Sequence, residues 1–359
     1  MPKILSVSTV KPPYEIQQHQ AVELTRALFS EKFNNIERLL RVFDNGDIDT
    51  RNICMPLEWF EKEHDFEERN HLYIDHAINF GVQAVQLCLE GDRMLQTPVK
   101  PSEIDAIFFI SSTGISTPSI EARIMNLLPF RDDTKRIPIW GLGCAGGAAG
   151  LSRAYEYCLA FPSANVLVLS VELCSLTFQK DDYSKSNLVG ASLFADGIAC
   201  TLVSGNQSNV KAKQPMPRII GTTSKFMPNS EDVMGWAVKN NGLHVIFSKS
   251  IPSIITKWLG PFVHEFLSEH ELTQNDMTHF IAHPGGKKVL KAYEDTLGFD
   301  NTKTTISREI LRENGNMSSP TILYVLQRFM KNKPVAGDYG LMAALGPGFC
   351  GELLLLEWE

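Results

Sequence analysis

The stretch GLGCAGGAAG, residues 141–150, places a single cysteine among glycine, alanine and leucine residues. It follows the apolar run RIPIW and precedes a helix-like segment of small residues. Cys144 is therefore predicted at the turn between a buried strand and a helix. A helix N-terminus carries free N–H groups and a partial positive charge, which would stabilise a thiolate and lower the pKa of this thiol.

The glycine residues around Cys144 have two possible roles. Those at 141, 143, 146 and 147 would let a substrate approach the backbone closely. The alternative is that small residues only allow the helix to pack tightly on a sheet. The local pattern by itself favours this structural role over catalysis.

Similar strand-like and helix-like segments continue in both directions from Cys144. Apolar runs that end in small or polar residues are typical of buried strands, and they occur at 3–10, 106–114, 136–144, 165–175, 279–286 and 339–358. The last range contains two strands joined at Gly-Pro-Gly. Helical spacing of apolar residues is found in 15–43, 66–90, 146–161, from about residue 287, and in the second part of 313–330.

The two halves of the chain can be aligned on this scheme. FISSTG corresponds to FIAHPG, and GCAGGAAG corresponds to GNMSSPTI, so that Cys144 lies opposite Asn316 and Ser112 opposite His283. A duplicated strand–helix unit predicts a layered α/β fold. The polar segment 204–217 is the best boundary candidate. It divides the chain into an N-terminal half, 1–215, and a C-terminal half, 216–359.

His283 and Asn316 change the interpretation of Cys144. A lone histidine on a strand is more often a satisfied core residue, and an asparagine before a helix is more often a turn or cap residue. Together with Cys144, however, they form a Cys–His–Asn series. The histidine can accept the thiol proton, and a neutral amide adds a hydrogen-bond donor that cannot take that proton.

Two reaction classes use such a set. Papain-like hydrolases have the same residue order, with a spacing of ~130–150 residues that His283 satisfies. Their CGSCW motif is absent, no secretory segment is recognisable, and Cys144 follows a buried strand. Condensing enzymes that transfer acyl groups are the other class.

Composition limits the remaining possibilities. The 359 residues, 43% hydrophobic and 21% charged, predict one large domain or two closely packed ones. A net charge of −7 argues against nucleic acid as the main partner. The seven cysteines lack CxxC spacing, so no metal site is expected, and free thiols fit the cytoplasm. No run of ~18 apolar residues occurs, so no membrane span is expected.

Four motifs, WGLGCAGGAAGLSRA, FIAHPGGKKVL, GNMSSPT and LGPGF, together resemble the type III polyketide synthases, the chalcone synthase-like family. The segments SSTGISTPS, ELCSLTF and NLVGASLFADG extend the resemblance over most of the chain. Within the family the sequence is most similar to bacterial alkylpyrone synthases. The resemblance implies the thiolase fold, with two βαβαβαββ halves in a five-layer αβαβα arrangement, and a homodimer.

The resemblance also implies a mechanism. Cys144 would carry the acyl group of an acyl-CoA starter, which we expect to be a fatty acyl group. His283 and Asn316 would donate hydrogen bonds to the thioester oxygen of malonyl-CoA and stabilise the enolate formed as CO₂ leaves. The enolate would attack the acyl-cysteine, and repeated rounds would give alkylpyrones or alkylresorcinols. CoA thioesters are substrates in this scheme, and no resident cofactor is implied.

Further positions carry over from the family. Phe194 matches an aromatic gatekeeper between the CoA tunnel and the cavity. Val245 stands where a second aromatic gatekeeper is usual, and Trp236 stands where plant enzymes keep a glycine, so the cavity is expected to differ in shape. The cavity-lining positions of the family match Thr113, Cys174, Thr177 and Ser318.

Four residues are expected to contact CoA. Arg38 and Arg41 match phosphate-contacting positions near the tunnel entrance, Asn45 stands where a lysine is common, and Lys288 is the fourth. These charges would steer an anionic substrate locally on an acidic protein. The alternative is that the two arginines belong to an ordinary solvated helix face.

Two alternatives to a polyketide synthase share its fold. Fatty-acid-initiating ketosynthases use the same three residues but usually have an asparagine soon after the histidine, as in His-Gln-Ala-Asn. This chain has HPGG there, which favours the polyketide branch. A non-catalytic thiolase-fold binding protein is the other, and the intact Cys–His–Asn set argues against it.

Overall fold

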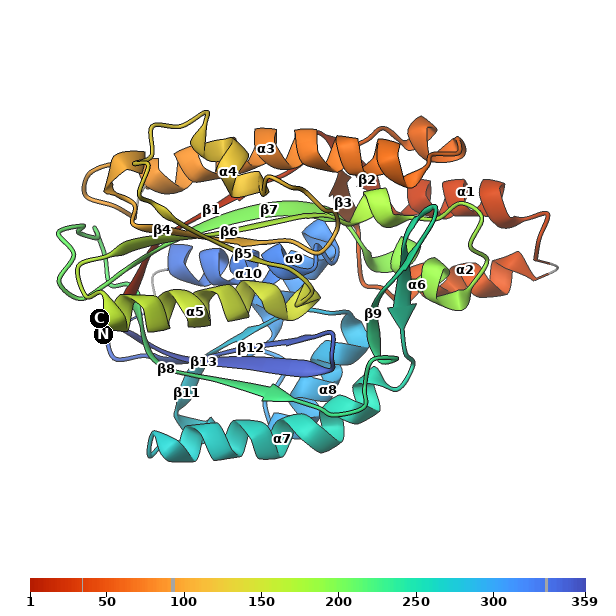
Figure 1. Cartoon of the computed structure of the whole chain (residues 1–359). Coiled ribbons are helices and arrows are strands. Elements are labelled where there is room, and N and C mark those ends of the chain that lie inside the picture. Colours follow the sequence, from red (N-terminus) through yellow and green to blue (C-terminus); the bar gives the residue numbers. More distant parts are fainter. Residues whose placement is uncertain (34, 92–93, 333–334) are drawn as a thin grey trace.

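The computed structural model describes residues 1–33, 35–91, 94–332 and 335–359. Helices and sheet alternate in five layers, as predicted (Figure 1). One outer layer contains α3 (Phe66–Glu90) and α4 (Ile120–Met125), and the other contains α7 (Ile251–Glu269) and α8 (Lys287–Leu297). The central layer contains α5 (Gly146–Ala160), α9 (Thr305–Asn314) and α10 (Ser319–Lys331), between two groups of strands.

The strands form one nine-stranded sheet in the order β11-β12-β13-β8-β1-β7-β6-β4-β5. The two groups join through the pairing of Lys3 in β1 with Arg218 in β8. The first group comprises β1 (Lys3–Val10), β4 (Ala106–Ile110), β5 (Lys135–Ile139), β6 (Asn165–Leu173) and β7 (Asp196–Ser204). The second comprises β8 (Pro217–Phe226), β11 (Met277–Ala282), β12 (Tyr339–Gly346) and β13 (Cys350–Trp358).

The second half has one strand fewer than the expected βαβαβαββ pattern, among the residues described. The chain runs from α9 through a turn into α10, because Gly315 and Ser318 both have positive φ, 69° and 59°. Within that turn Asn316 forms an isolated bridge with Phe194 instead of a strand. The backbone of Asn316 is thereby fixed, since its N–H donates to Leu193 O and its carbonyl accepts from Ala195 N.

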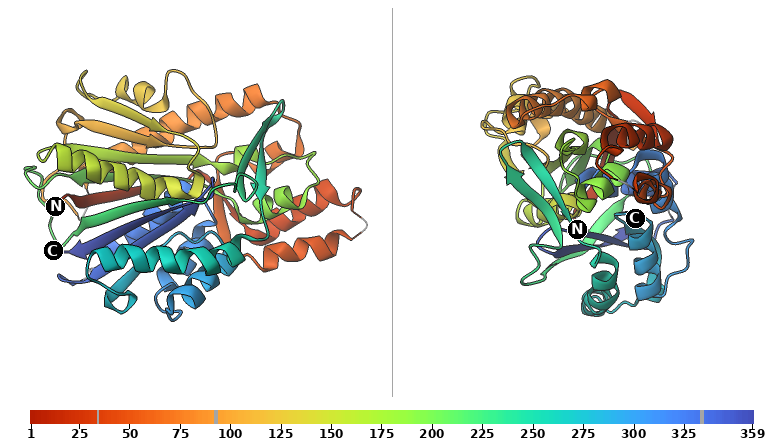
Figure 2. Two further views of the ribbon diagram at one scale, coloured as in Figure 1. Left: turned by 60° about the horizontal axis from the view of Figure 1, so that its bottom comes forward. Right: turned by 90° about the vertical axis from the view of Figure 1, so that its right-hand side faces the viewer.

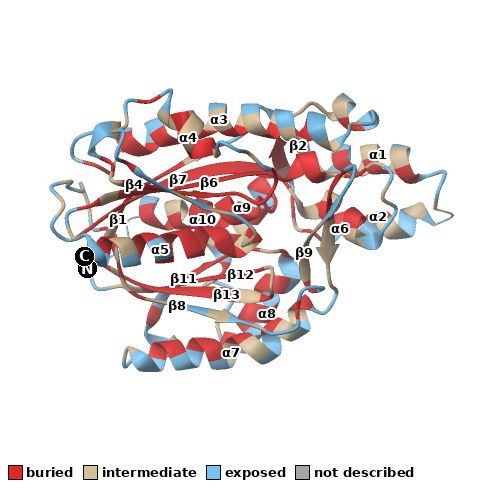
Figure 3. Ribbon diagram, in the orientation of Figure 1, coloured by how far each residue is buried: buried red, intermediate tan, exposed pale blue. Residues whose placement is uncertain are grey.

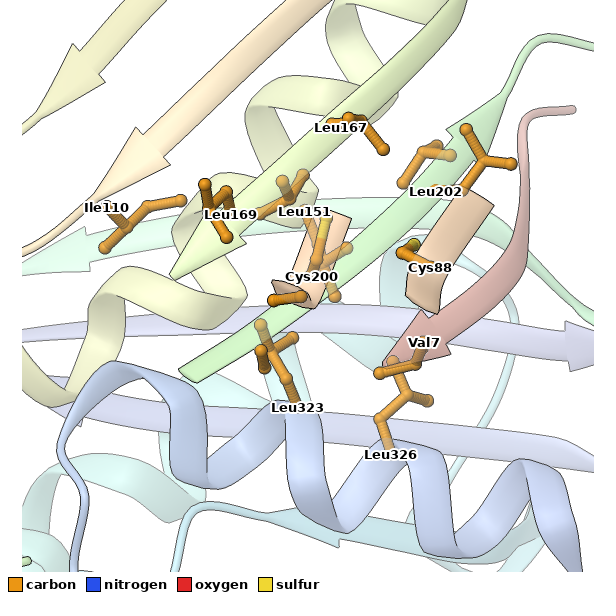
Figure 4. Close-up of a cluster of buried hydrophobic side chains, with 14 of the residues drawn as sticks. Val7, Cys88, Ile110, Leu151, Leu167, Leu169, Cys200, Leu202, Leu323 and Leu326 are labelled. Atoms are coloured by element: carbon orange, nitrogen blue, oxygen red, sulfur yellow. The ribbon is translucent and has the colours of Figure 1, made fainter. Parts of the chain in front are cut away.

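The core lies on both faces of the sheet. Buried residues fill the strands and the central helices, whereas α3 and α7 are buried on one side only (Figure 3). Figure 4 shows part of one cluster of buried hydrophobic side chains, in which Leu323 and Leu326 of α10 face Val7 and Cys200 of the sheet. Helix α10 is buried almost all round, which explains its run of apolar residues.

The edge strand β5 corrects one expectation. It was predicted to be buried like its neighbours, yet three of its five residues are exposed and two are half-buried. It lies at the end of the sheet, paired only with β4. Pro138, which cannot donate to a ladder, is tolerated at such an edge.

The region 15–43 contains two helices, α1 (Gln18–Phe29) and α2 (Ile36–Asp44), and residue 34 lies outside the described residues. They protrude at one end of the molecule beside α6 (Lys185–Leu193) (Figure 1). The remaining elements there are β2 (Tyr14–Gln17), β3 (Thr50–Ile53) and the 3₁₀ turn η1 (Leu57–Glu61). A separate aromatic core, including Phe29, Phe43 and Phe60, holds this end together.

A β-hairpin stands apart from the large sheet (Figure 2). It consists of β9 (Met234–Lys239) and β10 (Gly242–Phe247), which pair with each other. Short 3₁₀ turns complete the chain at η2 (Pro101–Glu103), η3 (Gly143–Ala145), η4 (Cys174–Thr177) and η5 (Gln274–Asp276). Within the described ranges, no helix combines the length and apolar character needed to cross a bilayer.

Candidate active site

Cys144 lies in η3, between β5 and α5, and Asn316 lies just before α10. The two turns meet because α5 and α10 approach very closely. A Cβ on Gly147 would lie 2.3 Å from the backbone oxygen of Ser319 in α10, and a Cβ on Gly143 would lie 2.8 Å from Pro347 Cδ. These two glycines therefore serve tight packing. The expectation that they open the backbone to a substrate is wrong, because both positions are already filled.

His283 approaches Cys144 and Asn316 from the edge of the sheet formed by β11, opposite the edge formed by β5. It follows β11, and its backbone N–H donates to Ala343 O of β12 at 2.9 Å. Its side chain is buried, as is that of Asn316. Cys144, His283 and Asn316 line one pocket of about 310 Å³, a volume that includes space open to solvent. The structure thus brings the three predicted residues together.

The hydrogen bonds of the three differ from the expected thiol–imidazole pair. The Cys144 thiol donates to Asn316 Oδ1 at 4.0 Å, and Ser318 N donates to the same oxygen at 2.8 Å. Asn316 Nδ2 faces Gly285 O at 3.4 Å. Both ring nitrogens of His283 lack a hydrogen-bond partner among the described residues. The imidazole can therefore bind a ligand with either nitrogen.

The protonation of Cys144 also corrects an expectation. Burial raises the pKa of its thiol to about 11, although hydrogen bonds from Ser318 and Asn316 act in the opposite direction. The predicted lowering by a helix N-terminus does not prevail, because loss of hydration is the larger effect. Burial likewise lowers the pKa of His283 to about 3. A Cys144 thiolate alone or a His283 imidazolium alone is costly in this buried site. The two charges should therefore form together, by proton transfer between the two groups.

Sequence reasoning missed Glu172, a buried carboxyl group at the end of β6. Its oxygens accept from the Ser112 backbone N–H at 3.0 Å, Ser112 Oγ at 2.9 Å, Thr113 Oγ1 at 2.9 Å and Ser319 Oγ at 2.8 Å. Burial raises the pKa of Glu172 to about 7 despite these bonds. Its negative charge contributes to the raised pKa of Cys144. In the sequence, the signal that could have revealed Glu172 was a charged residue inside an otherwise apolar strand.

Arg51 was also missed, and it holds the backbone at Phe194, the predicted gatekeeper, in place. Its guanidinium donates to the carbonyl oxygens of Ala191, Ser192 and Phe194 at 2.8, 2.8 and 2.9 Å. These carbonyls belong to the C-terminus of α6, where a cation is favourable. Burial lowers the pKa of Arg51 to about 10, so it remains a cation at neutral pH.

The predicted gatekeepers lie together beside the hairpin. Trp236 in β9 is paired with Val245 in β10. The indole lies against Phe194, with ring centroids 5.8 Å apart. Val245 and Phe194 both border a second, larger cavity of about 630 Å³, a volume that includes space open to solvent. Val245, which stands where a second aromatic residue is usual in the family, thus lies on the wall of this cavity.

The four cavity-lining predictions have different outcomes. Cys174 and Thr177 border the larger cavity. Thr113 borders a smaller pocket together with Leu176 and Thr177, separate from that of Cys144, and its hydroxyl donates to Glu172 and accepts from Leu173 N at 2.9 Å. Ser318 contacts the site through Asn316 and Cys144, as described above.

The predicted CoA contacts lie on the outer surface of α2 and α8. Arg38, Arg41 and Lys288 are exposed. No ion pair of these three is present within the described parts of the chain. Asn45 caps α2 by donating to Arg41 O at 2.8 Å. The neighbouring Lys287 pairs with Asp47 at 3.4 Å, which places the start of α8 beside the end of α2.

No cluster of three or more His, Cys, Asp or Glu side chains suited to a metal ion exists in the residues that the structure describes. All seven cysteines are free thiols.

Comparison with protein families decides the class of this site. Residues 2–207 match the family "Chalcone and stilbene synthases, N-terminal domain", and residues 218–358 match the corresponding C-terminal domain. The chain belongs to the chalcone and stilbene synthase family. It is a type III polyketide synthase, a condensing enzyme with the thiolase fold. This excludes the papain-like hydrolase that the order of Cys, His and Asn had left open.

Similar proteins occur in several bacteria. The chain is 49% identical to a "Putative chalcone synthase" of Bacillus subtilis, covering 99% of this chain and 98% of that protein. It is 27% identical to the alpha-pyrone synthesis polyketide synthase-like Pks18 of Mycobacterium tuberculosis, over 99% and 90%. The crystal structure of 1,3,6,8-tetrahydroxynaphthalene synthase from Streptomyces coelicolor superposes with a TM-score of 0.92 at 31% identity, covering 99% of each chain.

Proposed function

We propose that this type III polyketide synthase extends a fatty acyl-CoA starter with malonyl-CoA and releases alkylpyrones or alkylresorcinols. The observation that carries the proposal is the larger cavity. Phe194 borders it, and its walls come from β2, α1, β3, η1, η4, α6 and β10. Most of its lining is apolar, including Ile16, Leu24, Ile53, Leu57, Phe60 and Phe178. An alkyl chain would gain free energy from transfer into such a cavity.

The proposed roles of the three residues follow from their positions. Cys144 attacks the starter thioester after His283 has taken the thiol proton, and CoA leaves as the thiol. His283 and Asn316 then donate hydrogen bonds to the thioester oxygen of malonyl-CoA. As the bond to the carboxylate breaks, its electron pair forms the enolate and CO₂ departs. The enolate carbon attacks the carbonyl of the acyl-cysteine, the C–S bond breaks, and the Cys144 thiolate leaves. These groups suffice for the reaction, so we propose that it needs no resident cofactor.

Substrate delivery would involve the exposed cations on α2 and α8. We propose that Arg38, Arg41 and Lys288 contact the phosphates of CoA, and that Asn45 gives only a neutral contact where relatives have a charge. The pocket that contains Cys144 would then receive the thioester end of the CoA substrate.

We further propose a homodimer in the cytoplasm. The edge strand β5 leaves backbone groups unpaired, and Trp140 beside it is 52% exposed. A second copy of the chain could cover this edge. Seven free thiols fit a reducing compartment. Light scattering of the purified protein would test the dimer, and a monomer at micromolar concentration would contradict it.

The starter proposal is tested with purified protein, malonyl-CoA and acyl-CoA thioesters from six to eighteen carbons. We expect CO₂ release and products that retain the alkyl chain, detected by mass spectrometry. Products built from malonyl units alone, with no acyl chain incorporated, would refute the fatty acyl starter while leaving the enzyme class intact.

A further inference from the structure

A fourth residue with a polar side-chain group, Tyr293, lines the pocket of Cys144. Tyr293 lies on α8, one turn after Val289, and both residues line this pocket. Side chains of a helix lean toward its N-terminus, and the N-terminus of α8 directly follows the segment that carries His283. The phenol ring therefore leans toward the end of α8 that follows His283.

The Tyr293 hydroxyl has no hydrogen-bond partner among the described residues, although the side chain is 0% exposed. Its ring is held by an edge-to-face contact with Phe280, with centroids 5.8 Å apart. A buried hydroxyl without a partner is unfavourable, and native structures seldom keep one without a functional reason. The group is thus available to a ligand in this pocket.

The chemistry of the group restricts what it can bind. Burial, and secondarily the charge of a Cys144 thiolate, raise the pKa of Tyr293. The phenol therefore stays neutral and acts as a hydrogen-bond donor, not as a base. The remaining wall of the pocket is mainly apolar, with Met234, Phe247, Ile251, Ile255 and Leu345. A ligand oxygen at that end of the pocket would have Tyr293 as its donor.

We propose that the Tyr293 hydroxyl donates a hydrogen bond to the carboxylate of the malonyl group and thereby selects malonyl-CoA as extender. This rests on the proposed use of malonyl-CoA. Malonyl-CoA carries oxygen atoms at both ends, so His283 and Asn316 can hold the thioester oxygen while Tyr293 holds the carboxylate. A fatty acyl thioester has no second oxygen to occupy this donor. A neutral donor also avoids the strong ground-state stabilisation that a cation would give to the carboxylate.

The test is Tyr293→Phe, with wild-type protein and Tyr324→Phe alongside. Tyr324 is a matched control, because its buried hydroxyl has a structural partner, Val10 O at 2.8 Å. For Tyr293→Phe we expect the KM for malonyl-CoA to rise about tenfold or more, with the rate of starter loading, followed by intact mass, changed less than about twofold. Its melting temperature should stay the same or rise, because an unpartnered hydroxyl is removed. Tyr324→Phe should melt at a lower temperature and keep its KM.

The outcomes separate this inference from the proposed function. Wild-type protein that does not condense malonyl-CoA would refute the proposed function. Active wild-type protein with an unchanged KM in Tyr293→Phe would overturn only the role of Tyr293. A Tyr293→Phe protein that fails to fold, or melts lower with an unchanged KM, would also overturn it, since the hydroxyl would then be structural.

Discussion

The thiol of Cys144 donates its hydrogen bond to Asn316 Oδ1, at 4.0 Å, and not to His283. The two residues are 172 positions apart and meet because α5 and α10 begin side by side. Cys144 therefore lies beside a neutral amide, and burial raises the pKa of its thiol to about 11. For the proposed attack by Cys144, proton transfer to His283 must accompany substrate binding or attack.

Replacing Cys144 by alanine should abolish polyketide formation, by at least about 1000-fold. The variant should still release CO₂ from malonyl-CoA, because His283 and Asn316 remain to stabilise the enolate. Product analysis and CO₂ release measured on the same sample check this. Cys158→Ala, which removes a buried free thiol within α5, is the control and should keep forming product. Product formation by Cys144→Ala would remove Cys144 from its assigned role.

His283→Ala should leave the Cys144 thiol without a proton acceptor. Because burial raises the pKa of this thiol to about 11, its alkylation by iodoacetamide should keep accelerating up to about pH 10. At pH 7 the variant should react roughly 10–100 times more slowly than wild-type protein. Mass spectrometry of the modified Cys144 peptide gives both rates. Equal rates at pH 7 would show that His283 does not promote thiolate formation.

Glu172→Gln should change how stability depends on pH. In the folded protein the pKa of Glu172 is about 7, above its ordinary value of 4.5. The folded state therefore binds more protons between these values, and stability falls as the pH rises from about 4.5 to 7. The full effect would be about 3 kcal/mol. Urea unfolding at pH 5 and pH 8 should show a smaller difference in the variant.

The matched control for Glu172→Gln is Glu156→Gln, on the exposed side of α5, where the carboxylate pairs with Arg153. It should keep the pH dependence of the wild-type protein. If Glu172→Gln behaves in the same way, the ionisation of Glu172 does not oppose folding near neutral pH.

Filling the larger cavity should shorten the preferred starter. Ala21 on α1 lines this cavity, so Ala21→Phe should reduce kcat/KM for a sixteen-carbon starter about tenfold relative to a six-carbon starter. Val22→Phe is the control, since Val22 lies next to it on α1 and borders a different surface hollow. An unchanged chain-length preference in Ala21→Phe would place the alkyl chain elsewhere.

Removing both cations of α2, in Arg38→Ala/Arg41→Ala, should raise the KM for CoA thioesters about three- to tenfold at low salt, and less at high salt. Thioesters of N-acetylcysteamine lack the CoA phosphates and should show no such change. Arg26→Ala is the control, because Arg26 is already paired with Glu23 and Glu37. A rise in KM that is equal for both kinds of thioester would argue against phosphate contacts.

Much of the site could be predicted from local sequence. Strand, turn and helix each leave a periodic or small-residue pattern, so Cys144 and His283 could be placed after strands, and Asn316 in a turn before a helix, before any tertiary contact was known. The duplication of these turns also indicated that Cys144 and Asn316 hold equivalent places in the two halves. The same local reasoning misjudged β5, because an edge strand and a buried strand differ in their neighbours and not in their backbone pattern.

The sequence alone therefore determined the order of elements and the layered fold, since these follow from patterns within short segments, and its motifs pointed to Cys144, His283 and Asn316 as the candidate reacting side chains. Only the tertiary structure decided which other polar groups face them. Tyr293 and Glu172 come from a separate helix and strand, and nothing near them in the sequence reveals these neighbours. The protonation of Cys144 was decided there as well, because a pKa depends on the loss of hydration caused by every surrounding group.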